Sequence, residues 1–408
     1  MDSIQEGVYF RSKERPDDFL RLVFLNFSPE TTRTQAHDAL LKLWGMLQDL
    51  KQGIVRDLRP SQQGDPDYRV PTGKLTVLLG YGRRIFDFHS HANDWISPDD
   101  RPYELGLKLP PGENQPFRSL HWGKNVNTEV AQSDLVFQFI AVNELAVNRA
   151  VVEVQKLIDD QDLPLSINVF YQGFHREDRR SWIEFHDGIN NMVAKERIKA
   201  IEYKLLDQPW MTGGTFMAFF KIEVDLKAWR KLSRIEQEIL VGRNKLTGCP
   251  LDSADVVGDC LSKTEISGCP MTGSIPNNAP NSFLNPPRSA DSLIQSSHIH
   301  RSNLNRGNPG QDSNNRIFRQ GYEFLDWVEG KGISVGLNFI SFQRRIKAVR
   351  DIIGDPDWMG GVNFGGPEGE VKRPPAIELM SLISAGFYAI PPKLEPYPGA
   401  SLFNGKSI

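Results

Sequence analysis

Phe19–Phe27, with the sequence FLRLVFLNF, opens the pattern that decides the fold. Its apolar residues follow one another almost without interruption, which is typical of a buried strand. In the next segment the apolar residues of Leu40–Leu50 recur at helical spacing, and Thr34 is a plausible N-terminal cap. The sequence therefore predicts a strand followed by an amphipathic helix that covers one face of a sheet.

Working outward from this strand, the first half of the chain contains three more strands and a second helix. The strands are expected at Lys74–Gly82, Leu135–Ala141 and Leu165–Tyr171, and the helix at Asn143–Asp159. The order is then β-α-β-β-α-β. This is the order of a ferredoxin-like unit, whose strands form an antiparallel sheet.

The second half repeats this order loosely. Strands are predicted at Thr215–Val224, Gly336–Phe342 and Ala385–Ile390. Ser233, followed three residues later by Glu236, is a capping box and predicts the start of a helix. We therefore predict an α+β fold made of two ferredoxin-like (βαββαβ) domains with antiparallel sheets. No direct sequence repeat accompanies this duplication, which rests on the order of elements alone.

The expected domains are residues 1–195 and 196–408, with a long loop at about 248–315 in the second. The loop is rich in Ser, Asn, Pro and Gly, and a loop of this length in a compact domain is usually functional or disordered. It also holds the only three cysteines, Cys249, Cys260 and Cys269. Their number and irregular spacing predict neither a disulfide framework nor a zinc site.

Composition excludes several classes of partner. The 408 residues carry a net charge of −3 with 24% charged residues, so no basic field predicts nucleic-acid binding. No apolar run of ~18 residues predicts a membrane span. The first residues contain no apolar core of signal-peptide length. The expected location is therefore the cytoplasm.

Asp187 is the first candidate functional residue. It lies in Glu184–Met192 (EFHDGINNM), where an Asp-Gly pair followed by Ile-Asn-Asn is typical of a turn. The simpler interpretation is an Asx-type turn or a helix cap. The functional interpretation is a carboxylate that takes a proton from a peroxide and returns it to the leaving oxygen.

Two H-x-H pairs are the next candidates. His298 and His300 form one pair, and His89 and His91 form the other. In a strand both members of such a pair point the same way and could share a metal ion. A single imidazole would suffice as the axial ligand of haem iron. Ordinary surface or hydrogen-bonded histidines are the simpler alternative.

Arg319 is the third candidate, in the segment Asn315–Phe324 (NRIFRQGYEF). On a strand Arg319 shares a face with Ile317, which suggests that it points inward. An inward guanidinium needs an anionic partner, and in an active site it would stabilise negative charge on a peroxide oxygen. A surface arginine on a strand is the simpler alternative.

Taken together, these segments resemble the dye-decolorizing (DyP-type) peroxidase family. The resemblance covers most of the chain and keeps the order of the family's motifs. The matching segments are Phe185–Asn190 (FHDGIN), Gly213–Ala218 (GGTFMA) with Lys221 and Ile222, Leu240–Arg243 (LVGR) with Lys245–Gly248 (KLTG), His298 with Ile299, Arg316–Tyr322 (RIFRQGY) and Gly336–Gln343 (GLNFISFQ).

The resemblance implies haem b, bound in the C-terminal domain between its sheet and helices. Carried over by position, His298 would bind the iron as the proximal ligand. Asp187 would be the distal acid–base residue and Arg319 the distal arginine. Three further residues are assigned by the same resemblance: Arg301 to a haem propionate, and Leu337 and Phe339 to the distal face. Glu378 is the candidate acceptor for the proximal imidazole, which would make this ligand more electron-rich.

Three positions depart from the family pattern. Glu184 replaces the first glycine of the family's G-x-x-D-G motif, His300 replaces a usual arginine, and Gln320 replaces the second arginine of R-R-G. Glycine often permits a close backbone approach, so Glu184 is expected to shift the loop or to add a second carboxylate. None of the three removes the iron ligand, the acid or the distal arginine.

The predicted function is a haem peroxidase that reduces hydrogen peroxide and oxidises organic donors such as dyes or phenols by one-electron steps. Side chains proposed to relay electrons are Trp182, Trp229, Trp327 and Tyr322, although each is also typical of ordinary packing. Two alternatives stay open: a haem-binding or haem-handling protein with little peroxidase activity, and a non-haem metal enzyme that uses the H-x-H pairs. A homo-oligomer is possible with any of them.

Overall fold

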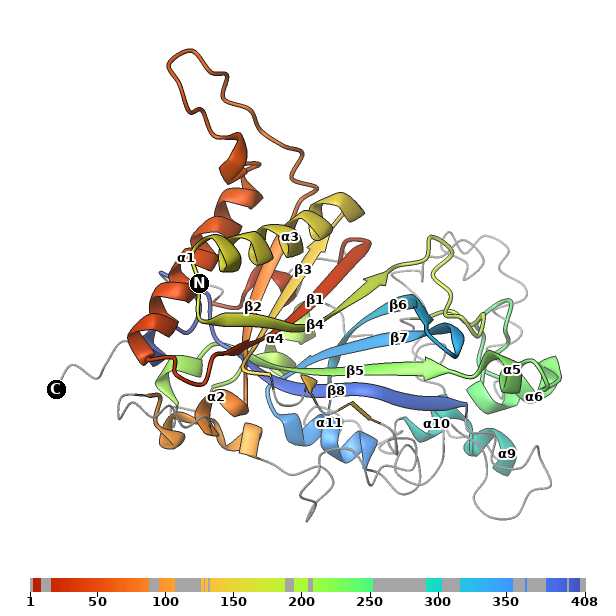
Figure 1. Ribbon diagram of the computed structural model, residues 1–408. Coiled ribbons are helices and arrows are strands. Elements are labelled where there is room, and N and C mark those ends of the chain that lie inside the picture. Colours follow the sequence, from red (N-terminus) through yellow and green to blue (C-terminus); the bar gives the residue numbers. More distant parts are fainter. Residues whose placement is uncertain are drawn as a thin grey trace.

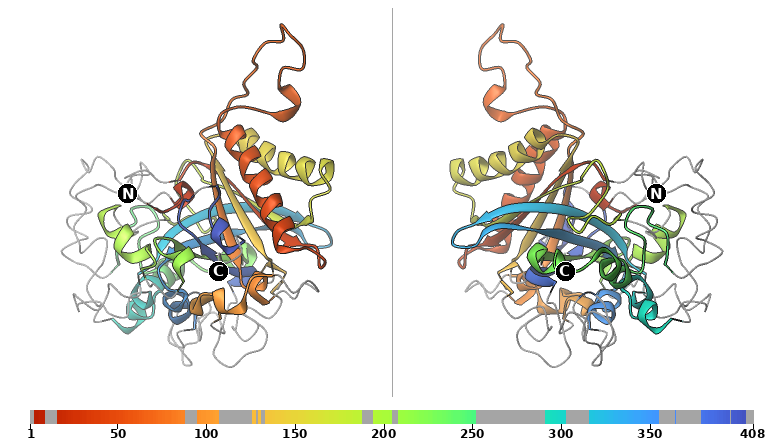
Figure 2. Two further views of the ribbon diagram at one scale, coloured as in Figure 1. Left: turned by 90° about the vertical axis from the view of Figure 1, so that its left-hand side faces the viewer. Right: turned by 90° about the vertical axis from the view of Figure 1, so that its right-hand side faces the viewer.

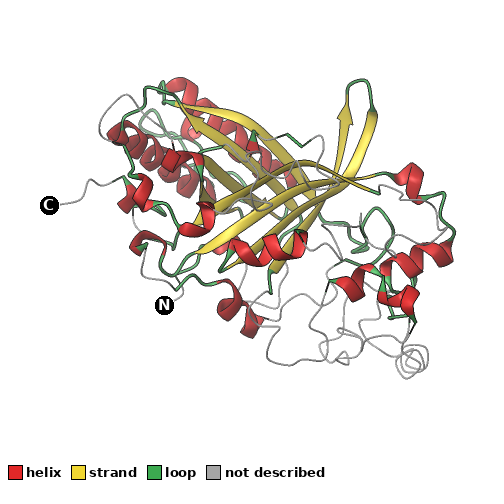
Figure 3. Cartoon of the chain, turned by 90° about the horizontal axis from the view of Figure 1, so that it is seen from below, coloured by secondary structure: helices red, strands yellow, loops and turns green. Residues whose placement is uncertain are grey.

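A computed structural model gives the fold, and it describes residues 3–8, 16–87, 95–106, 126–127, 129–130, 133–187, 194–204, 208–251, 291–302, 316–354, 364, 379–394 and 396–403. Strands occupy the centre of the molecule, and helices lie on both sides of them (Figure 3). Within these residues, no helix combines the length and the apolar character needed to cross a membrane.

The N-terminal half has the predicted β-α-β-β-α-β order (Figure 1). Its strands are β1 (Phe19–Phe27), β2 (Thr76–Gly82), β3 (Leu135–Ala141) and β4 (Leu165–Phe174), and its long helices are α1 (Arg33–Lys51) and α3 (Glu144–Asp160). The shorter helices are η1 (Glu6–Val8), η2 (Arg56–Leu58), α2 (Arg84–Asp87), η3 (Pro98–Asp100) and η4 (Tyr103–Gly106). Each predicted strand of this half is confirmed, and β4 extends beyond its predicted end.

The C-terminal half follows the same order with more helices between its first two strands. Its strands are β5 (Thr215–Val224), β6 (Phe318–Val328), β7 (Gly332–Gln343) and β8 (Met380–Ile390). The helices are α4 (Ala194–Ile201), η6 (Pro209–Met211), α5 (Leu226–Trp229), α6 (Arg234–Val241), α9 (Ser292–Gln295), α10 (His298–Arg301), α11 (Ile346–Ile353) and η8 (Ala400–Leu402). The C-terminal part of the predicted long loop therefore contains two short helices, α9 and α10.

The eight strands form one closed antiparallel barrel in the order β1-β3-β2-β8-β5-β7-β6-β4. Within it, each half keeps the ferredoxin-like order, since β4-β1-β3-β2 and β8-β5-β7-β6 are equivalent runs. The halves join at Tyr81↔Ala389 and Gly82↔Tyr388 on one side and at Phe174↔Glu323 on the other. The α+β prediction of two ferredoxin-like halves is confirmed. The division at residues 195 and 196 stays a prediction.

Three hydrophobic clusters follow from the alternation of side chains along the strands. One lies under α1 and α3 on the outer face of the N-terminal strands. The second fills the barrel and draws residues from both halves, among them Phe24, Phe219 and Tyr388. The third lies on the outer face of the C-terminal strands, beneath α5, α6 and α11. Helices α1 and α3 lie on the other side of the barrel from α10 and α11 (Figures 1 and 2).

Helix caps agree with the sequence in one of two cases. Ser233 and Glu236 form the predicted capping box at the start of α6. The first helix is capped by Thr32 with Gln35 rather than by Thr34. A Thr at either position can cap a helix, and Gln35 selects Thr32 because its side chain reaches back to the Thr32 backbone.

Candidate active site

The outer face of β6 and β7 carries a row of partly exposed side chains in the middle of the sheet. Alternation places Arg319, Gly321 and Glu323 of β6 on this face, opposite Ser341, Phe339 and Leu337 of β7. Arg319, Gly321, Leu337 and Phe339 are each partly exposed. The predicted shared face of Ile317 and Arg319 is consistent with this pattern. A ligand could therefore lie against this part of the sheet.

Asp187 is brought to this face by the loop that follows β4. The loop doubles back on itself, because Ser181 N–H donates to Phe185 O at 2.9 Å and Asp187 N–H donates to Arg179 O at 3.1 Å. The Arg180 guanidinium then ties the loop to the segment after α6 by donating to Lys245 O at 2.7 Å. These bonds hold Asp187 beside the strands of the C-terminal half, although it precedes all of them in the sequence.

Gly321 makes room for the Asp187 carboxylate. A Cβ atom placed on Gly321 would lie 3.3 Å from Asp187 Oδ2 and 3.1 Å from Leu337 Cδ1. Asp187 therefore sits directly over the strand, between the positions of Arg319 and Glu323. A larger residue at position 321 would have to displace the carboxylate or the leucine.

His298 lies on α10, the short helix at the end of the long loop. Its Nδ1 is 2.8 Å from the carbonyl oxygen of Phe364, and the Phe364 ring stacks on the imidazole at 4.4 Å with an interplanar angle of 12°. Because a carbonyl only accepts, Nδ1 carries the proton in this arrangement. The neutral ring then has its lone pair on Nε2, the nitrogen that would face a metal.

The surroundings of His298 favour the neutral ring. Burial is the largest effect and lowers the pKa of His298 to about 4, while the Phe364 carbonyl acts in the opposite direction. The charge of Arg319 lowers this pKa further and that of Asp187 raises it, so both groups are close enough to act on the imidazole. The imidazole is thus available as a ligand at neutral pH.

The expected metal-binding pair of His298 and His300 is not supported. The segment forms a helical turn instead of a strand, so residues two apart do not face each other. His300 is buried, and its Nδ1 contacts Ser297 Oγ at 3.1 Å. Within the described part of the chain no three His, Cys, Asp or Glu residues could hold a metal ion. His89 and His91 lie outside the described residues.

Arg301 and Glu378 are the remaining predicted site residues. Arg301 follows His300 on α10 and is partly exposed. Glu378 lies outside the described residues, and the observed contact of His298 Nδ1 is the Phe364 carbonyl. Cys249 is bonded in a disulfide, although the number and spacing of the cysteines predicted no disulfide framework.

Two residues of the site were not predicted from sequence. Phe364 contacts His298 from far along the chain and gives no local signal. Glu323 is 6% exposed on the same face as Arg319 and Gly321. Its place could have been found from strand alternation, since it lies four residues after Arg319. Its burial could not, because that depends on the loop carrying Asp187.

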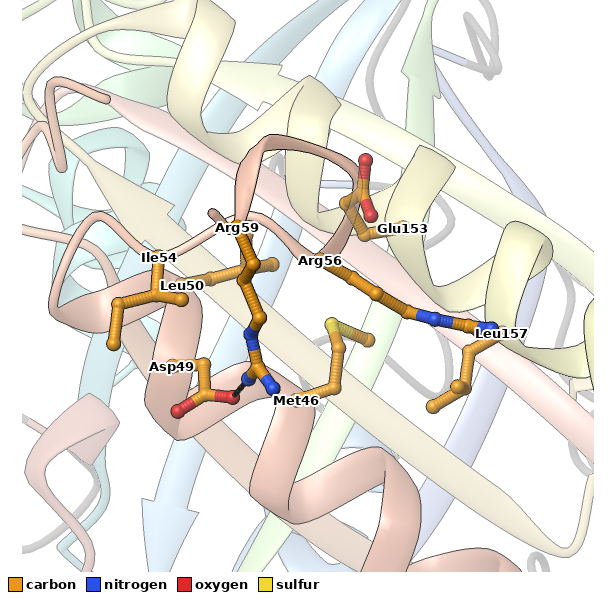
Figure 4. Close-up of a pocket in the computed structure, with 8 residues that line it drawn as sticks. All are labelled: Met46, Asp49, Leu50, Ile54, Arg56, Arg59, Glu153 and Leu157. Atoms are coloured by element: carbon orange, nitrogen blue, oxygen red, sulfur yellow. Dashed lines mark hydrogen bonds and ion pairs between the residues drawn. The ribbon is translucent and has the colours of Figure 1, made fainter. Parts of the chain in front are cut away.

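A surface pocket lies elsewhere, between the helices of the N-terminal half (Figure 4). It is lined by Met46, Asp49, Leu50, Ile54, Arg56, Arg59, Glu153 and Leu157. Arg59 pairs with Asp49 inside it. It contains no imidazole and none of the predicted site residues, so we do not assign it the chemistry of the outer sheet face.

A family model described as Dyp-type peroxidase, C-terminal, matches residues 178–373, just under half of the chain. The matched region begins before Asp187 and includes His298, Arg319 and the sheet face between them. Over this region the chain matches the DyP-type peroxidase family. The predicted resemblance is confirmed.

Curated relatives carry the same family name. A dye-decolorizing peroxidase of Mycobacterium tuberculosis is 27% identical over 216 residues, which cover 53% of this chain and 53% of that protein. A dye-decolorizing peroxidase of Rhodococcus erythropolis is 24% identical over 241 residues, which cover 56% of this chain and 57% of that protein. The chain thus spans about half the length of the curated relatives it matches.

Solved structures extend the similarity of fold to nearly the whole chain. A DyP-type peroxidase from Cellulomonas bogoriensis has a TM-score of 0.67 at 21% identity, covering 96% of this chain and 95% of that one. Ferric DtpA from Streptomyces lividans has a TM-score of 0.66 at 20% identity, and the match covers 97% of this chain and 94% of that one. At these identities the comparison shows a shared fold.

Glu184 departs from the DyP-type motif, and the backbone explains why the family has glycine there. Its φ is 67°, in the left-handed region that glycine occupies without steric cost. The Glu184 side chain is 53% exposed and pairs with Arg176 at 3.4 Å. Glu184 therefore adopts the left-handed backbone conformation that glycine would adopt at this position. Its side-chain carboxylate pairs with Arg176.

The described residues fit a haem group better than a bare metal ion. They offer one neutral imidazole instead of a cluster of ligands, and a partly exposed apolar pair, Leu337 and Phe339, on the facing sheet. Gly321 leaves room above the strand where Asp187 lies. A flat, largely apolar group with a single axial nitrogen ligand suits this donor set.

Proposed function

We propose that this protein is a haem peroxidase, which reduces hydrogen peroxide and oxidises organic donors such as dyes or phenols by one-electron steps. One observation carries the proposal: Asp187 and Arg319 lie by the same sheet face, and both act on the neutral imidazole of His298. An acid–base group, a cation and an axial ligand are the three functions that peroxide cleavage at haem requires.

Five residues are proposed to hold the cofactor, which we take to be haem b. His298 Nε2 would bind the iron, and Arg301 would pair with a propionate. Leu337 and Phe339 would cover the distal face, and Glu378 is retained as the predicted acceptor near the proximal imidazole. When bound, the haem iron supplies the redox chemistry of peroxide reduction.

Asp187 and Arg319 would carry out the protein's part of the chemistry. The Asp187 carboxylate would accept a proton from hydrogen peroxide and return it to the oxygen that leaves as water. Arg319 stabilises the negative charge that develops as the O–O bond lengthens. Gly321 lets the carboxylate lie close to the strand that carries this guanidinium.

Electrons from a bulky donor would enter at the surface. Of the four aromatic residues suggested as relays, Trp327 is 76% exposed, whereas Trp229 and Tyr322 are buried. Trp182 is partly exposed, and its Nε1 donates to Phe324 O at 3.0 Å. Exposure favours Trp327 as the side chain that a donor could contact.

A haem-binding protein with little peroxidase activity is the second candidate. It is favoured by the contact of His298 Nδ1 with a backbone carbonyl, because a carbonyl makes the imidazole less electron-rich than a carboxylate would. A less electron-rich ligand gives weaker support to O–O cleavage. The non-haem metal enzyme has no such support among the described residues.

Peroxide turnover by the haem-loaded protein separates these candidates. We expect Asp187→Ala and Arg319→Ala each to lower the rate by a factor of about 100 or more, because each removes a group that acts on the breaking bond. Glu223→Gln, on another strand, is the control and should keep the wild-type rate. Haem binding without turnover in the wild type would select the binding protein instead.

The remaining assignments concern partners and location. Peroxide and an organic donor are the proposed substrates, a homo-oligomer is a proposed assembly, and no partner is proposed among nucleic acids or membranes. A structural neighbour from Mycobacterium smegmatis, 18% identical with a TM-score of 0.61, is described as encapsulated.

The expected cytoplasmic location is weakened by the disulfide of Cys249, since such bonds are rare in a reducing cytosol.

A further inference from the structure

Glu323 is a buried acid that the proposed chemistry does not use. It lies on the outer face of β6, is 6% exposed, and takes part in no ion pair within the described part of the chain. Its carboxyl accepts a hydrogen bond from the backbone N–H of Trp182. Leu337 is its cross-strand neighbour on β7, and Phe174 its neighbour on β4. An unpaired buried carboxylate is costly, so such a group calls for an explanation.

Asp187 separates Glu323 from Arg319. The three residues Arg319, Gly321 and Glu323 follow one another along one face of β6, each about 7 Å from the next. The Asp187 carboxylate lies over the middle one, where a Cβ would be 3.3 Å from its Oδ2. The carboxylate therefore lies between the strand position of a permanent cation and that of a second carboxyl group.

The surroundings keep Glu323 protonated at neutral pH. Burial is the main cause and raises the pKa of Glu323 to about 9, and the negative charge of Asp187 adds to the effect. The other charged groups that face it come from the loop after β4: Arg176 lowers this pKa and Asp178 raises it. The neighbour from β7, Leu337, is apolar. Glu323 is thus a neutral acid beside a carboxylate.

We propose that Glu323 is a positioning residue for Asp187: as a neutral acid it lets Arg319 hold the Asp187 carboxylate over Gly321, and as an anion it repels that carboxylate. This role rests on the proposed peroxidase function. Proton loss from Glu323 would place a second negative charge next to Asp187 and weaken its hold by Arg319. Peroxide cleavage would then fail at alkaline pH although Asp187, Arg319 and His298 are all present.

Infrared spectroscopy of the haem-free protein tests the coupling without any turnover. The carbonyl stretch of a protonated carboxylic acid should be present at neutral pH, titrate in the alkaline range, and be absent from Glu323→Gln. In Asp187→Asn the midpoint should fall by about one pH unit or more, because the neighbouring charge is gone. A midpoint that is the same in Asp187→Asn and wild type would overturn the proposal.

The pH profile of the haem-loaded protein tests the consequence. Glu323→Gln stays neutral at every pH, so its alkaline loss of peroxide turnover should shift upward by about one pH unit or more. Glu223→Gln is the matched control, since Glu223 also lies on a strand but pairs with Lys331, and it should keep the wild-type profile. An unshifted profile in Glu323→Gln would refute the role of Glu323. No turnover in the wild type at any pH would instead refute the proposed function, and the infrared result would still show whether the two carboxyls are coupled.

Discussion

Two glutamates near Asp187, Glu184 and Glu323, each lower the stability of the folded protein, for different reasons. Glu184 has a left-handed backbone but a solvated side chain, whereas Glu323 has an ordinary strand backbone but a buried acid. Steric crowding of a Cβ atom in the left-handed region costs about 1–2 kcal/mol. A buried acid such as Glu323 also lowers stability over the pH range in which the folded protein holds a proton that the unfolded chain would release.

The backbone cost at Glu184 can be measured by comparing two substitutions. Glu184→Gly and Glu184→Ala both remove the ion pair with Arg176, but only glycine relieves the left-handed conformation. We expect Glu184→Gly to be more stable than Glu184→Ala by about 1 kcal/mol, after allowance for the greater freedom of glycine in the unfolded chain. Urea unfolding followed by circular dichroism measures the difference. Equal stability would mean that this position carries no strain.

The proton held by Glu323 links stability to pH. The pKa of Glu323 is about 9 in the folded protein, against a usual value of 4.5. Between these values the folded state binds more protons than the unfolded state, so this residue makes stability fall as pH rises, by at most about 1.4 kcal/mol per pH unit.

Glu323→Gln removes this dependence. Its stability relative to wild type should therefore rise steadily from about pH 5 to about pH 8.5, because the wild type loses stability over that range. Thermal unfolding at several pH values measures the trend, and Glu223→Gln serves as the control. A constant difference between Glu323→Gln and wild type would show that Glu323 ionises normally.

At the scale of elements, the helix that carries His298 is held by the end of α6. Gly242 caps α6 with a φ of 88°, and a Cβ there would lie 2.4 Å from Ser297 Oγ and 2.7 Å from Ile299 Cγ1. These two residues flank His298 on α10. The glycine therefore allows α6 and α10 to meet closely, and this contact fixes where the imidazole lies.

Gly242→Ala should displace α10 and weaken haem binding. We expect a loss of stability of about 2–4 kcal/mol, from left-handed strain together with overpacking. Gly330→Ala is the matched control: its φ is 75°, but no atom lies within 4 Å of its added Cβ, so only the strain applies. Haem titrations of the two variants measure the effect. Similar haem affinity in both would show that the α6–α10 contact does not position His298.

Local patterns predicted most elements but not their contacts. Apolar runs located the strands, and alternation placed Arg319 on the face where it lies. The sequence predicts a long loop around His298, because a helix of four residues is too short to show a helical period. Burial of Glu323 and stacking of Phe364 depend on segments far away in sequence, so no local pattern reveals them.

At the scale of the whole molecule, the two ferredoxin-like halves share one core. Inside the barrel, the ring of Phe24 on β1 packs against two rings of the other half. The distance between ring centroids is 5.5 Å to Phe219 of β5 and 5.7 Å to Tyr388 of β8. Two strand pairs, β2 with β8 and β4 with β6, join the halves through three paired residues among those described, and these leave no sequence signal. This is why closure of the barrel could not be predicted. The shared core should make the halves unfold together.

Phe24→Ala tests this cooperativity. The cavity should lower the free energy of unfolding by about 3–5 kcal/mol. Because the lost contacts join the halves, circular dichroism and tryptophan fluorescence should still report one common midpoint. Phe170→Ala, at a strand residue that is 50% exposed, is the control and should cost far less. Two separate transitions in Phe24→Ala would show that the halves fold independently.

The most direct test of the central claim is a haem titration followed by the Soret absorbance of the wild type, His298→Ala and His300→Gln. His300 lies on the same short helix and contacts Ser297, so its variant controls for damage to α10. We predict that the wild type and His300→Gln bind one haem per chain, and that His298→Ala loses the band of the ligated iron. An unchanged spectrum and affinity in His298→Ala would contradict the account.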